Sequence, residues 1–115
     1  MIAANTLKEL LAFRKDRDWE QFHTFKNLAI SLTLEAAELL EQVQWTADGE
    51  IAGVVEQKRD EISSEMADIA IYLTYLAHDL GVDLDAAVKK KLLVNARKYP
   101  VAKARGNARK YDQLG

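Results

Sequence analysis

Residues 27–44 read NLAISLTLEAAELLEQVQ, an apolar segment in which polar residues recur at helical spacing. When this segment is wound as an α-helix at ~100° per residue, four polar residues fall in one stripe ~60° wide. The stripe consists of Ser31, Glu35, Glu38 and Gln42. Apolar residues flank it on both sides, whereas an ordinary surface helix has one apolar stripe and a broad polar face. The segment therefore predicts a helix with a narrow acidic seam between two apolar flanks.

Residues 56–80 repeat this arrangement further along the chain. Their polar stripe consists of Glu61, Glu65, Asp68 and Tyr72, and Ile, Met and Leu residues border it. If both helices pack through their flanks, the seams meet in a partly dry cleft. Carboxylates left unpaired there are destabilised by on the order of several kcal/mol each. Such a cleft favours a bound cation, and all-oxygen ligands suit Mg²⁺, Mn²⁺ or Ca²⁺ rather than Zn²⁺.

The alternative interpretation is that both stripes are solvated helix faces, because Glu-x-x-Glu pairs are common on surface helices. Two features favour the metal site. Both stripes are narrow, and neither contains a Lys or Arg residue at a position that would pair with its carboxylates. A carboxylate beside a bound metal ion can also accept a proton from water, and Glu38 or Glu35 is the predicted general base.

The rest of the chain predicts an all-α protein with four helices and a single domain over residues 1–115. A capping box, Thr6 to Glu9, predicts the start of a first helix that ends near residue 16. An ordered loop covers residues 18–23. The remaining helices are predicted from Thr24 or Asn27 to about residue 44, over 56–80, and from Asp83 to about residue 99. The tail, about 101–115, is basic and has no apolar period.

Charge is divided unevenly along the chain. Residues 1–84 hold seven Lys or Arg against sixteen Asp or Glu, and residues 85–115 hold nine against two. The acidic part suggests cation binding and the basic part a phosphate-rich partner, although two solvated faces that attract each other in the fold would have the same charges. A nucleic-acid-binding module would explain the basic part but not the acidic seams, so no nucleic-acid partner is predicted.

The composition excludes several classes of protein. There is no cysteine, so disulfides and thiolate zinc sites are absent. The N-terminal residues lack the apolar stretch of a signal peptide, and no apolar run has the length of a membrane span. We therefore expect a cytoplasmic protein with no membrane partner.

Further candidate residues lie outside the two seams. Lys91, Asn95 and Lys98 share one face of the fourth predicted helix, where they can present two cations and an amide to a ligand. Trp19 and Trp45 lie in loops, where an aromatic ring can stack on a base for ~1–3 kcal/mol or can simply cover the core. His23 lies outside both seams and is interpreted as a structural hydrogen-bonding residue.

The paired motifs Glu35-x-x-Glu38 and Glu65-x-x-Asp68 resemble those of the MazG-like, all-α nucleotide pyrophosphohydrolases. Further segments are similar to the dCTP pyrophosphatase branch of that family, and the resemblance covers nearly the whole chain. These segments are Asp18-Trp-Glu-Gln-Phe-His23, Gln44-Trp45, Ile71-Tyr72-Leu73, Lys91-x-x-x-Asn95, Lys98-Tyr99-Pro100 and Arg109-Lys-Tyr111.

The resemblance implies a reaction and a set of site residues. It implies hydrolysis of a deoxynucleoside triphosphate, dCTP or a related one, to the monophosphate and pyrophosphate, with Mg²⁺ as cofactor and Mn²⁺ as the alternative. The metal ligands that it implies are Glu35, Glu38, Glu65 and Asp68. It implies a base pocket built with Trp19, Trp45 and Asn95, and it places Tyr72, Lys91 and Lys98 toward the nucleotide or its phosphates. Leu10 departs from the family pattern, because close relatives carry a histidine there.

The apolar flanks of the two seams also predict how the protein assembles. Helices that are apolar on both sides of a seam have more apolar surface than one short chain can bury. We therefore expect a four-helix bundle of the MazG-like type that is completed by homo-oligomerisation, as a homodimer or homotetramer. The alternatives within reach of the same fold are a non-catalytic regulatory or interaction protein and a phosphoribosyl-ATP or dUTP pyrophosphohydrolase.

Overall fold

The computed structural model describes residues 2–114, and it is all-α within that range, with no strand. The predicted fold class is confirmed. Two compact units make up the chain, Ile2–Gly81 and the residues that follow Gly81. The first unit holds α1 (Ala4–Asp16), α2 (Phe25–Glu41), α3 (Ile51–Gln57) and α4 (Arg59–Leu80). A single domain over residues 1–115 stays a prediction.

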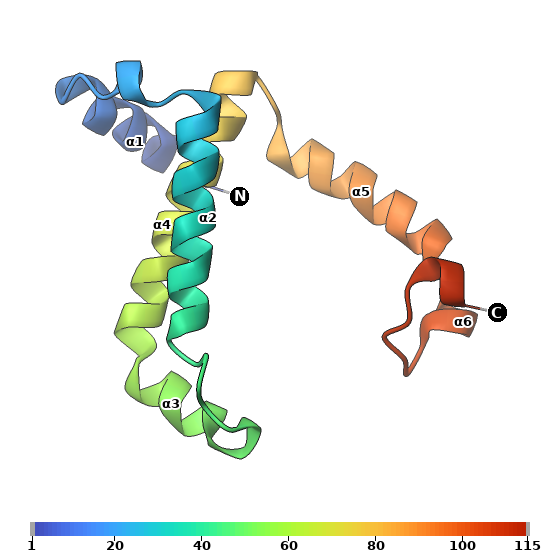
Figure 1. Cartoon of the computed structure of the whole chain (residues 1–115). Helices are drawn as coiled ribbons and strands as arrows, with labels where there is room; N and C mark the ends of the chain where they lie inside the picture. The colour runs from blue at the N-terminus through green and yellow to red at the C-terminus, as the bar shows by residue number, and fades with distance from the viewer. Residues whose placement is uncertain (1, 115) are drawn as a thin grey trace. The chain divides into compact units, whose positions relative to one another are not determined.

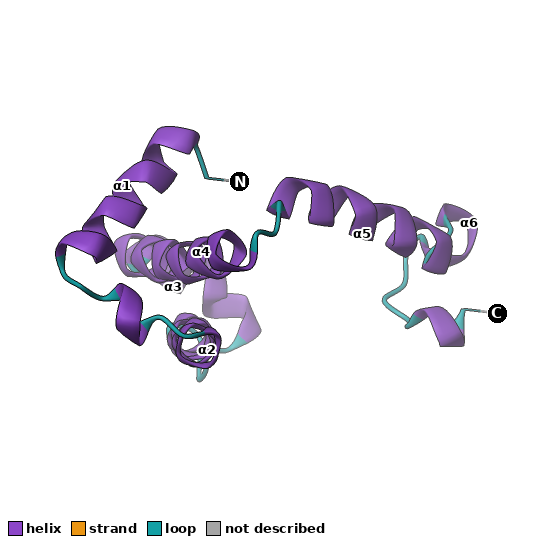
Figure 2. Cartoon of the chain, turned by 90° about the horizontal axis from the view of Figure 1, so that it is seen from above, coloured by secondary structure: helices purple, strands orange, loops and turns teal. Residues whose placement is uncertain are grey.

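Helices α2 and α4 form the body of the first unit. They run antiparallel and side by side, and α1 lies near the end where α2 begins (Figures 1 and 2). Thr24 caps α2, because its side-chain oxygen accepts a hydrogen bond of 3.1 Å from the backbone N–H of Asn27. Gly81 ends α4 in the left-handed conformation, at φ 66°, which glycine adopts without a steric cost.

The core of the unit lies where α1, α2 and α4 meet. Leu28 of α2 is 1% exposed and packs with Tyr75 and Leu76 of α4. Leu10 and Leu11 of α1 pack against this cluster. The Tyr75 hydroxyl donates a hydrogen bond of 2.7 Å to the Leu10 carbonyl, so α1 is joined to α4 by a polar contact as well as by packing.

Only one flank of the α2 seam is covered within the first unit. Leu28 and Leu32 pack toward α4, whereas Ile30 and Leu34 on the other flank are 47% and 58% exposed. The second flank is therefore left uncovered within this unit. The physical reason is that α2 has one long helical neighbour, α4, and a single neighbour covers about one face of a helix.

Several helix boundaries differ from the prediction. Helix α1 begins at Ala4, and the Thr6 capping box is not formed, because Ala3 occupies the capping position with no side-chain bond. The predicted helix over 56–80 is two helices, α3 and α4, with a break at Lys58. Helix α3 also contains a glycine, Gly53. Glycine lowers helix stability without forbidding it, and a boundary read from local pattern carries an error of a turn.

The second unit contains α5 (Leu84–Lys98), α6 (Val101–Ala104) and a 3₁₀ turn at Tyr111–Gln113. The predicted cap is confirmed, since the Asp83 side chain accepts a bond of 3.1 Å from the N–H of Ala86. The basic tail, for which no helix was predicted, contains the short helix α6. Tyr111 packs edge-on against Tyr99 with ring centroids 6.4 Å apart, and the Lys98 Nζ lies 4.6 Å from the Tyr111 ring centroid.

Within residues 2–114, no helix combines the length and the hydropathy needed to cross a bilayer.

Candidate active site

Three carboxylates from the two seams meet between α2 and α4. Glu35 and Glu38 come from one side of α2, and Glu65 comes from α4. One carboxylate oxygen from each of the three lies within 4.8 Å of the others. We call these three residues the carboxylate cluster. Asp68, one turn after Glu65 on α4, lies outside this distance and acts on Glu35 through its charge.

The carboxylate cluster contains buried oxygen atoms that have neither water nor a hydrogen-bond donor as a partner. Among the described residues, Glu35 Oε2 and Glu65 Oε2 are buried without a hydrogen bond. The proton that Glu35 can share with the neighbouring Glu65 carboxyl is the main cause that raises the pKa of Glu35, from 4.5 to about 7. Loss of hydration and the charges of Glu38 and Asp68 act in the same direction. The metal-free cluster therefore favours taking up a positive charge, as a proton or as a cation.

The raised pKa of Glu35 predicts how the metal-free protein responds to pH. The folded state binds this proton more tightly than the unfolded chain, so the contribution of Glu35 to stability is present at low pH and is lost as the pH rises from about 4.5 to about 7. With a chelator present, we expect the advantage of the parent over Glu35→Gln to fall by several degrees of melting temperature between pH 5 and pH 8.

The comparison with Glu35→Gln is needed because His23 acts in the opposite direction. Burial and the charge of Arg14 lower the pKa of His23, so His23 costs stability as the pH falls. That cost is common to both proteins, and the difference between their melting curves isolates Glu35. Curves that stay parallel across this pH range would contradict the prediction.

An aromatic pocket of about 420 Å³ adjoins the carboxylate cluster. Asp68 and Tyr72 connect the two, because they continue the α4 stripe from Glu65 at helical spacing and also line the pocket. The pocket is lined by Leu10, Phe13, Trp19, His23, Asp68, Ile71, Tyr72 and Tyr75. A planar ring in this pocket would lie beside a group of carboxylates that can hold a cation.

Local backbone geometry turns Trp19 back toward α1. Asp18 has φ 54°, in the left-handed region that Asp tolerates better than most residues. After this turn the backbone N–H of Trp19 donates a hydrogen bond of 2.9 Å to the backbone carbonyl of Arg14. The Trp19 and Phe13 rings meet edge-on, with their centroids 5.7 Å apart. The guanidinium carbon of Arg17 lies 3.7 Å from the centroid of the Phe13 ring. Trp19 is thereby held as a wall of the aromatic pocket.

An ion pair lies behind the pocket wall. Arg14 is 6% exposed and donates two hydrogen bonds to the Asp79 carboxylate, at 3.0 and 2.5 Å. Its guanidinium lies 4.6 Å from the Tyr75 ring centroid. The hydrogen bond from Arg14 lowers the pKa of Asp79, and the bond to Asp79 raises the pKa of Arg14. Both groups are thus held in their charged forms, which ties α1 to the end of α4.

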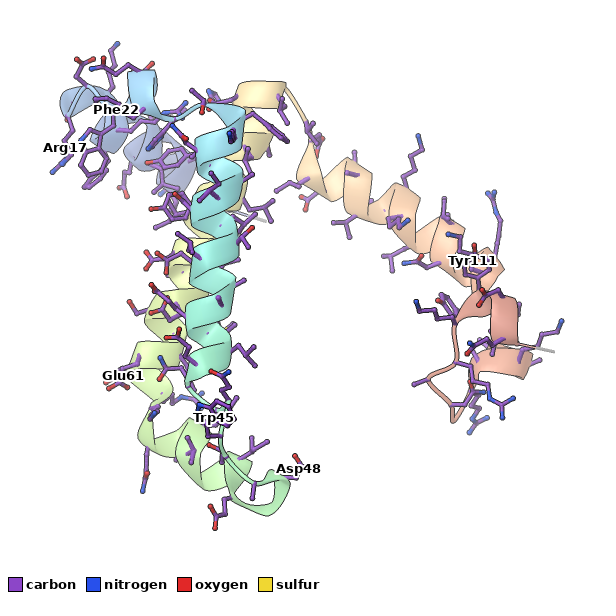
Figure 3. The ribbon with its side chains drawn as sticks, in the orientation of Figure 1. Arg17, Phe22, Trp45, Asp48, Glu61 and Tyr111 are labelled. Atoms are coloured by element: carbon purple, nitrogen blue, oxygen red, sulfur yellow. The ribbon has the colours of Figure 1, made fainter. Side chains whose placement is uncertain are left out.

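The other candidate residues lie apart from the pocket or in the second unit. Trp45 follows α2 and is 91% exposed, at the end of the first unit opposite to Phe22 (Figure 3). The first unit alone therefore does not bring Trp45 to Trp19. Lys91, Asn95 and Lys98 lie on α5 of the second unit, and their part in the site stays a prediction.

Sequence reasoning missed several pocket residues. Phe13, Ile71 and Tyr75 were not predicted, and Leu10 was noted only as a departure from the family. Leu10 and Phe13 are three positions apart, as are Tyr72 and Tyr75, so the members of each pair lie on the same side of their helix. A helical projection of the first helix would therefore have suggested that Leu10 and Phe13 line the pocket together. His23 was interpreted as a hydrogen-bonding residue, and it does contact Arg14, but it also lines the pocket.

A model of the MazG-like family matches residues 30–114, a range that contains both carboxylate pairs. The chain belongs to the MazG-like family. The resemblance read from the sequence is thereby confirmed.

Proteins similar to this MazG-like chain include two mammalian relatives and one solved structure. It is 43% identical over 104 residues to dCTP pyrophosphatase 1 of Homo sapiens and 41% identical over 104 residues to that of Rattus norvegicus. Each match covers 89% of this chain but 61% of the relative's length. The crystal structure of a pyrophosphatase from Archaeoglobus fulgidus is 43% identical with a TM-score of 0.81, and the match covers 84% of this chain and 90% of that one.

Proposed function

We propose that this MazG-like chain is a nucleoside triphosphate pyrophosphohydrolase that converts dCTP, or a related deoxynucleoside triphosphate, to the monophosphate and pyrophosphate. The observation that carries the proposal is a carboxylate cluster with two unpartnered buried oxygens beside an aromatic pocket. The similarity to proteins named dCTP pyrophosphatase supports the reaction and the substrate.

The residues of the carboxylate cluster fit a divalent cation. Glu35, Glu38 and Glu65 offer oxygen ligands within one coordination sphere, and the orphaned oxygens of Glu35 and Glu65 have no other partner among the described residues. We propose that these three hold Mg²⁺ together with Asp68, which lies near enough to act on Glu35 electrostatically. Bound Mg²⁺ supplies positive charge that neutralises the triphosphate and its transition state.

The two glutamates of α2 differ in their access to solvent. Glu38 is exposed, whereas Glu35 is half-buried and its Oε2 is fully buried. We therefore assign proton acceptance to Glu38 in addition to its part in holding the cation, and a ligand role alone to Glu35. Glu38 takes a proton from the water that attacks the α-phosphorus. The bond from that phosphorus to the oxygen bridging the β-phosphorus breaks, and pyrophosphate leaves with that oxygen.

The aromatic pocket suits the base. Trp19 and Tyr72 offer ring faces, and stacking on one of them stabilises a bound base by ~1–3 kcal/mol. Asp68 lies between the pocket and the carboxylate cluster, so a base in the pocket directs its phosphates toward the cation. We further propose that Lys91, Asn95 and Lys98 of α5 complete the site, within one domain over residues 1–115.

Product analysis tests the proposal. With Mg²⁺ present, dCTP is expected to yield dCMP and pyrophosphate in equal amounts, with a higher kcat/KM than the other three deoxynucleotides. A chelator should abolish turnover and added Mg²⁺ should restore it, because the carboxylate cluster needs a cation to approach a polyanion. Formation of dCDP and phosphate, or turnover that a chelator leaves unchanged, would contradict the proposal. Absence of all turnover would favour a non-catalytic regulator.

We also propose a homo-oligomer. Within the first unit, an apolar face of α2 formed by Phe25, Ile30 and Leu34 is 47–63% exposed and lines a groove of about 510 Å³. We assign this face to a second copy of the chain, because an exposed apolar patch of this kind marks an association surface. Light scattering is expected to give the mass of two or four chains at micromolar concentration.

A single substitution should separate the copies. Leu34→Lys places a charge on the apolar face, and we expect it to shift the mass toward one chain. Gln57→Lys adds the same charge at an exposed polar position of α3 and should leave the mass unchanged. A monomeric parent, or a Leu34→Lys variant that keeps the parent's mass, would refute the assignment.

A further inference from the structure

His23 lies where the aromatic pocket meets the Arg14–Asp79 ion pair, in which Arg14 is buried and the Asp79 side chain is 33% exposed. Its ring centroid is 5.1 Å from that of Tyr75 and 6.5 Å from that of Trp19. Its Nδ1 lies 3.4 Å from Arg14 Nη1, at the long end of hydrogen-bond distances. The same Nη1 donates to Asp79, so the position of the guanidinium beside His23 is set by the ion pair.

The chemistry of arginine decides which nitrogen of His23 carries the proton. A guanidinium has only donors, so it can meet Nδ1 only if Nδ1 is an acceptor. A proton on Nδ1 would point an N–H at a positively charged N–H group. The neutral ring must then carry its proton on Nε2. Among the described residues, no hydrogen bond involves Nε2, and His23 lines the pocket.

We propose that the Arg14–Asp79 ion pair is a positioning device that holds His23 in the Nε2–H form, so that His23 presents a hydrogen-bond donor to an acceptor on the base in the aromatic pocket. The inference rests on the proposed function for the identity of the ligand. Its chemical class is a planar heterocycle with a ring carbonyl or ring nitrogen that accepts a bond, as cytosine has.

The remaining pocket groups show why a fixed donor matters. Leu10, Phe13 and Ile71 are apolar, and the Tyr75 hydroxyl already donates to the Leu10 carbonyl. Asp68 as a carboxylate can only accept. Trp19 and Tyr72 carry the other possible donors, but among the described residues neither the Trp19 indole N–H nor the Tyr72 hydroxyl hydrogen-bonds to a charged side chain. His23 is the lining residue whose donor atom is selected by the buried Arg14 guanidinium, which Asp79 holds in place. It is therefore a specificity-determining residue, and Arg14 and Asp79 are positioning residues.

Imidazole NMR tests the tautomer without any turnover. The chain has two histidines, His23 and His78, so His78→Gln assigns the spectrum of protein labelled with ¹⁵N-histidine. At pH 7.5, the long-range ¹⁵N–¹H correlations of His23 are expected to show the Nε2–H form. Addition of dCMP should shift the Nε2 signal of His23 and leave that of His78 in place. An Nδ1–H form, an imidazolium, or a His23 signal that dCMP leaves unmoved would overturn the inference.

Kinetics test the donor and its control by Arg14. His23→Phe keeps a ring but removes the donor, and we expect the KM for dCTP to rise by about 10-fold with kcat within threefold. His23→Gln restores an N–H near the place of Nε2 and should recover most of the loss. Arg14→Lys keeps the positive charge but lacks the planar guanidinium with its fixed N–H donors. We expect the imidazole NMR signals of His23 in this variant to show both tautomers.

Three outcomes would overturn the proposal in these experiments. They are an unchanged KM in His23→Phe, an equal loss in His23→Gln, and a single Nε2–H form retained in a folded Arg14→Lys. Failure of the proposed function would look different, because the parent would then lack turnover altogether while the tautomer of the ligand-free protein would still be read directly by NMR.

Discussion

Glu65→Gln is expected to lower kcat/KM for dCTP by roughly 100-fold or more, because it removes a charged ligand from the proposed cation site. The same substitution is expected to raise the melting temperature of the metal-free protein. Glu65 is the neighbour that contributes most to the raised pKa of Glu35, and its own Oε2 is buried without a partner. Replacing one of two repelling carboxyls relieves that cost. Loss of activity with a gain in stability distinguishes a metal ligand from a structural residue.

Glu61 provides a matched control on the same helix. It lies one turn before Glu65, belongs to the same sequence stripe, and is exposed outside the carboxylate cluster (Figure 3). Glu61→Gln should keep turnover within a few-fold and should bind Mg²⁺ as the parent does in calorimetric titration. A Glu65→Gln protein that unfolds in the presence of chelator, or that retains the parent's turnover, would mean that Glu65 has no role as a metal ligand.

Asp79→Ala is expected to lower the free energy of unfolding by about 3 kcal/mol, measured by urea denaturation. The size of this loss follows from the state of Arg14 after the carboxylate is removed. The Arg14 side chain is 8% exposed, so the substitution leaves a nearly buried guanidinium without its carboxylate. Asp79→Asn should cost less, because its amide oxygen still accepts one of the two hydrogen bonds.

The chain also contains an exposed ion pair for comparison. Arg59 and Glu56 lie 3.7 Å apart with side chains 73% and 77% exposed. Glu56→Ala should therefore cost less than about 1 kcal/mol, because water and salt screen the pair and the freed arginine stays hydrated. Equal losses in Asp79→Ala and Glu56→Ala would contradict the role given to the Arg14–Asp79 pair.

Sequence alone was sufficient for the features that depend on one helix at a time. The spacing of Glu35 and Glu38 puts both carboxylates on one side of α2, and Glu65, Asp68 and Tyr72 share a side of α4, because the pitch of an α-helix is the same in every protein. The sequence also predicted a helix start at Thr24 or Asn27 and a helix end at residue 80, since capping is a contact between residues a few positions apart.

Only the tertiary structure decided how these helices meet. Helical periodicity gives the direction of a side chain about its own axis, but it does not give the rotation of one helix against the next. That rotation buries an oxygen of Glu35 while Glu38 stays exposed, and it turns Asp68 toward the aromatic pocket. The contact of Arg14 with Asp79 joins residues 65 positions apart. No local pattern marks such a pair, because the free energy that selects it comes from packing α1 against α4 as a whole.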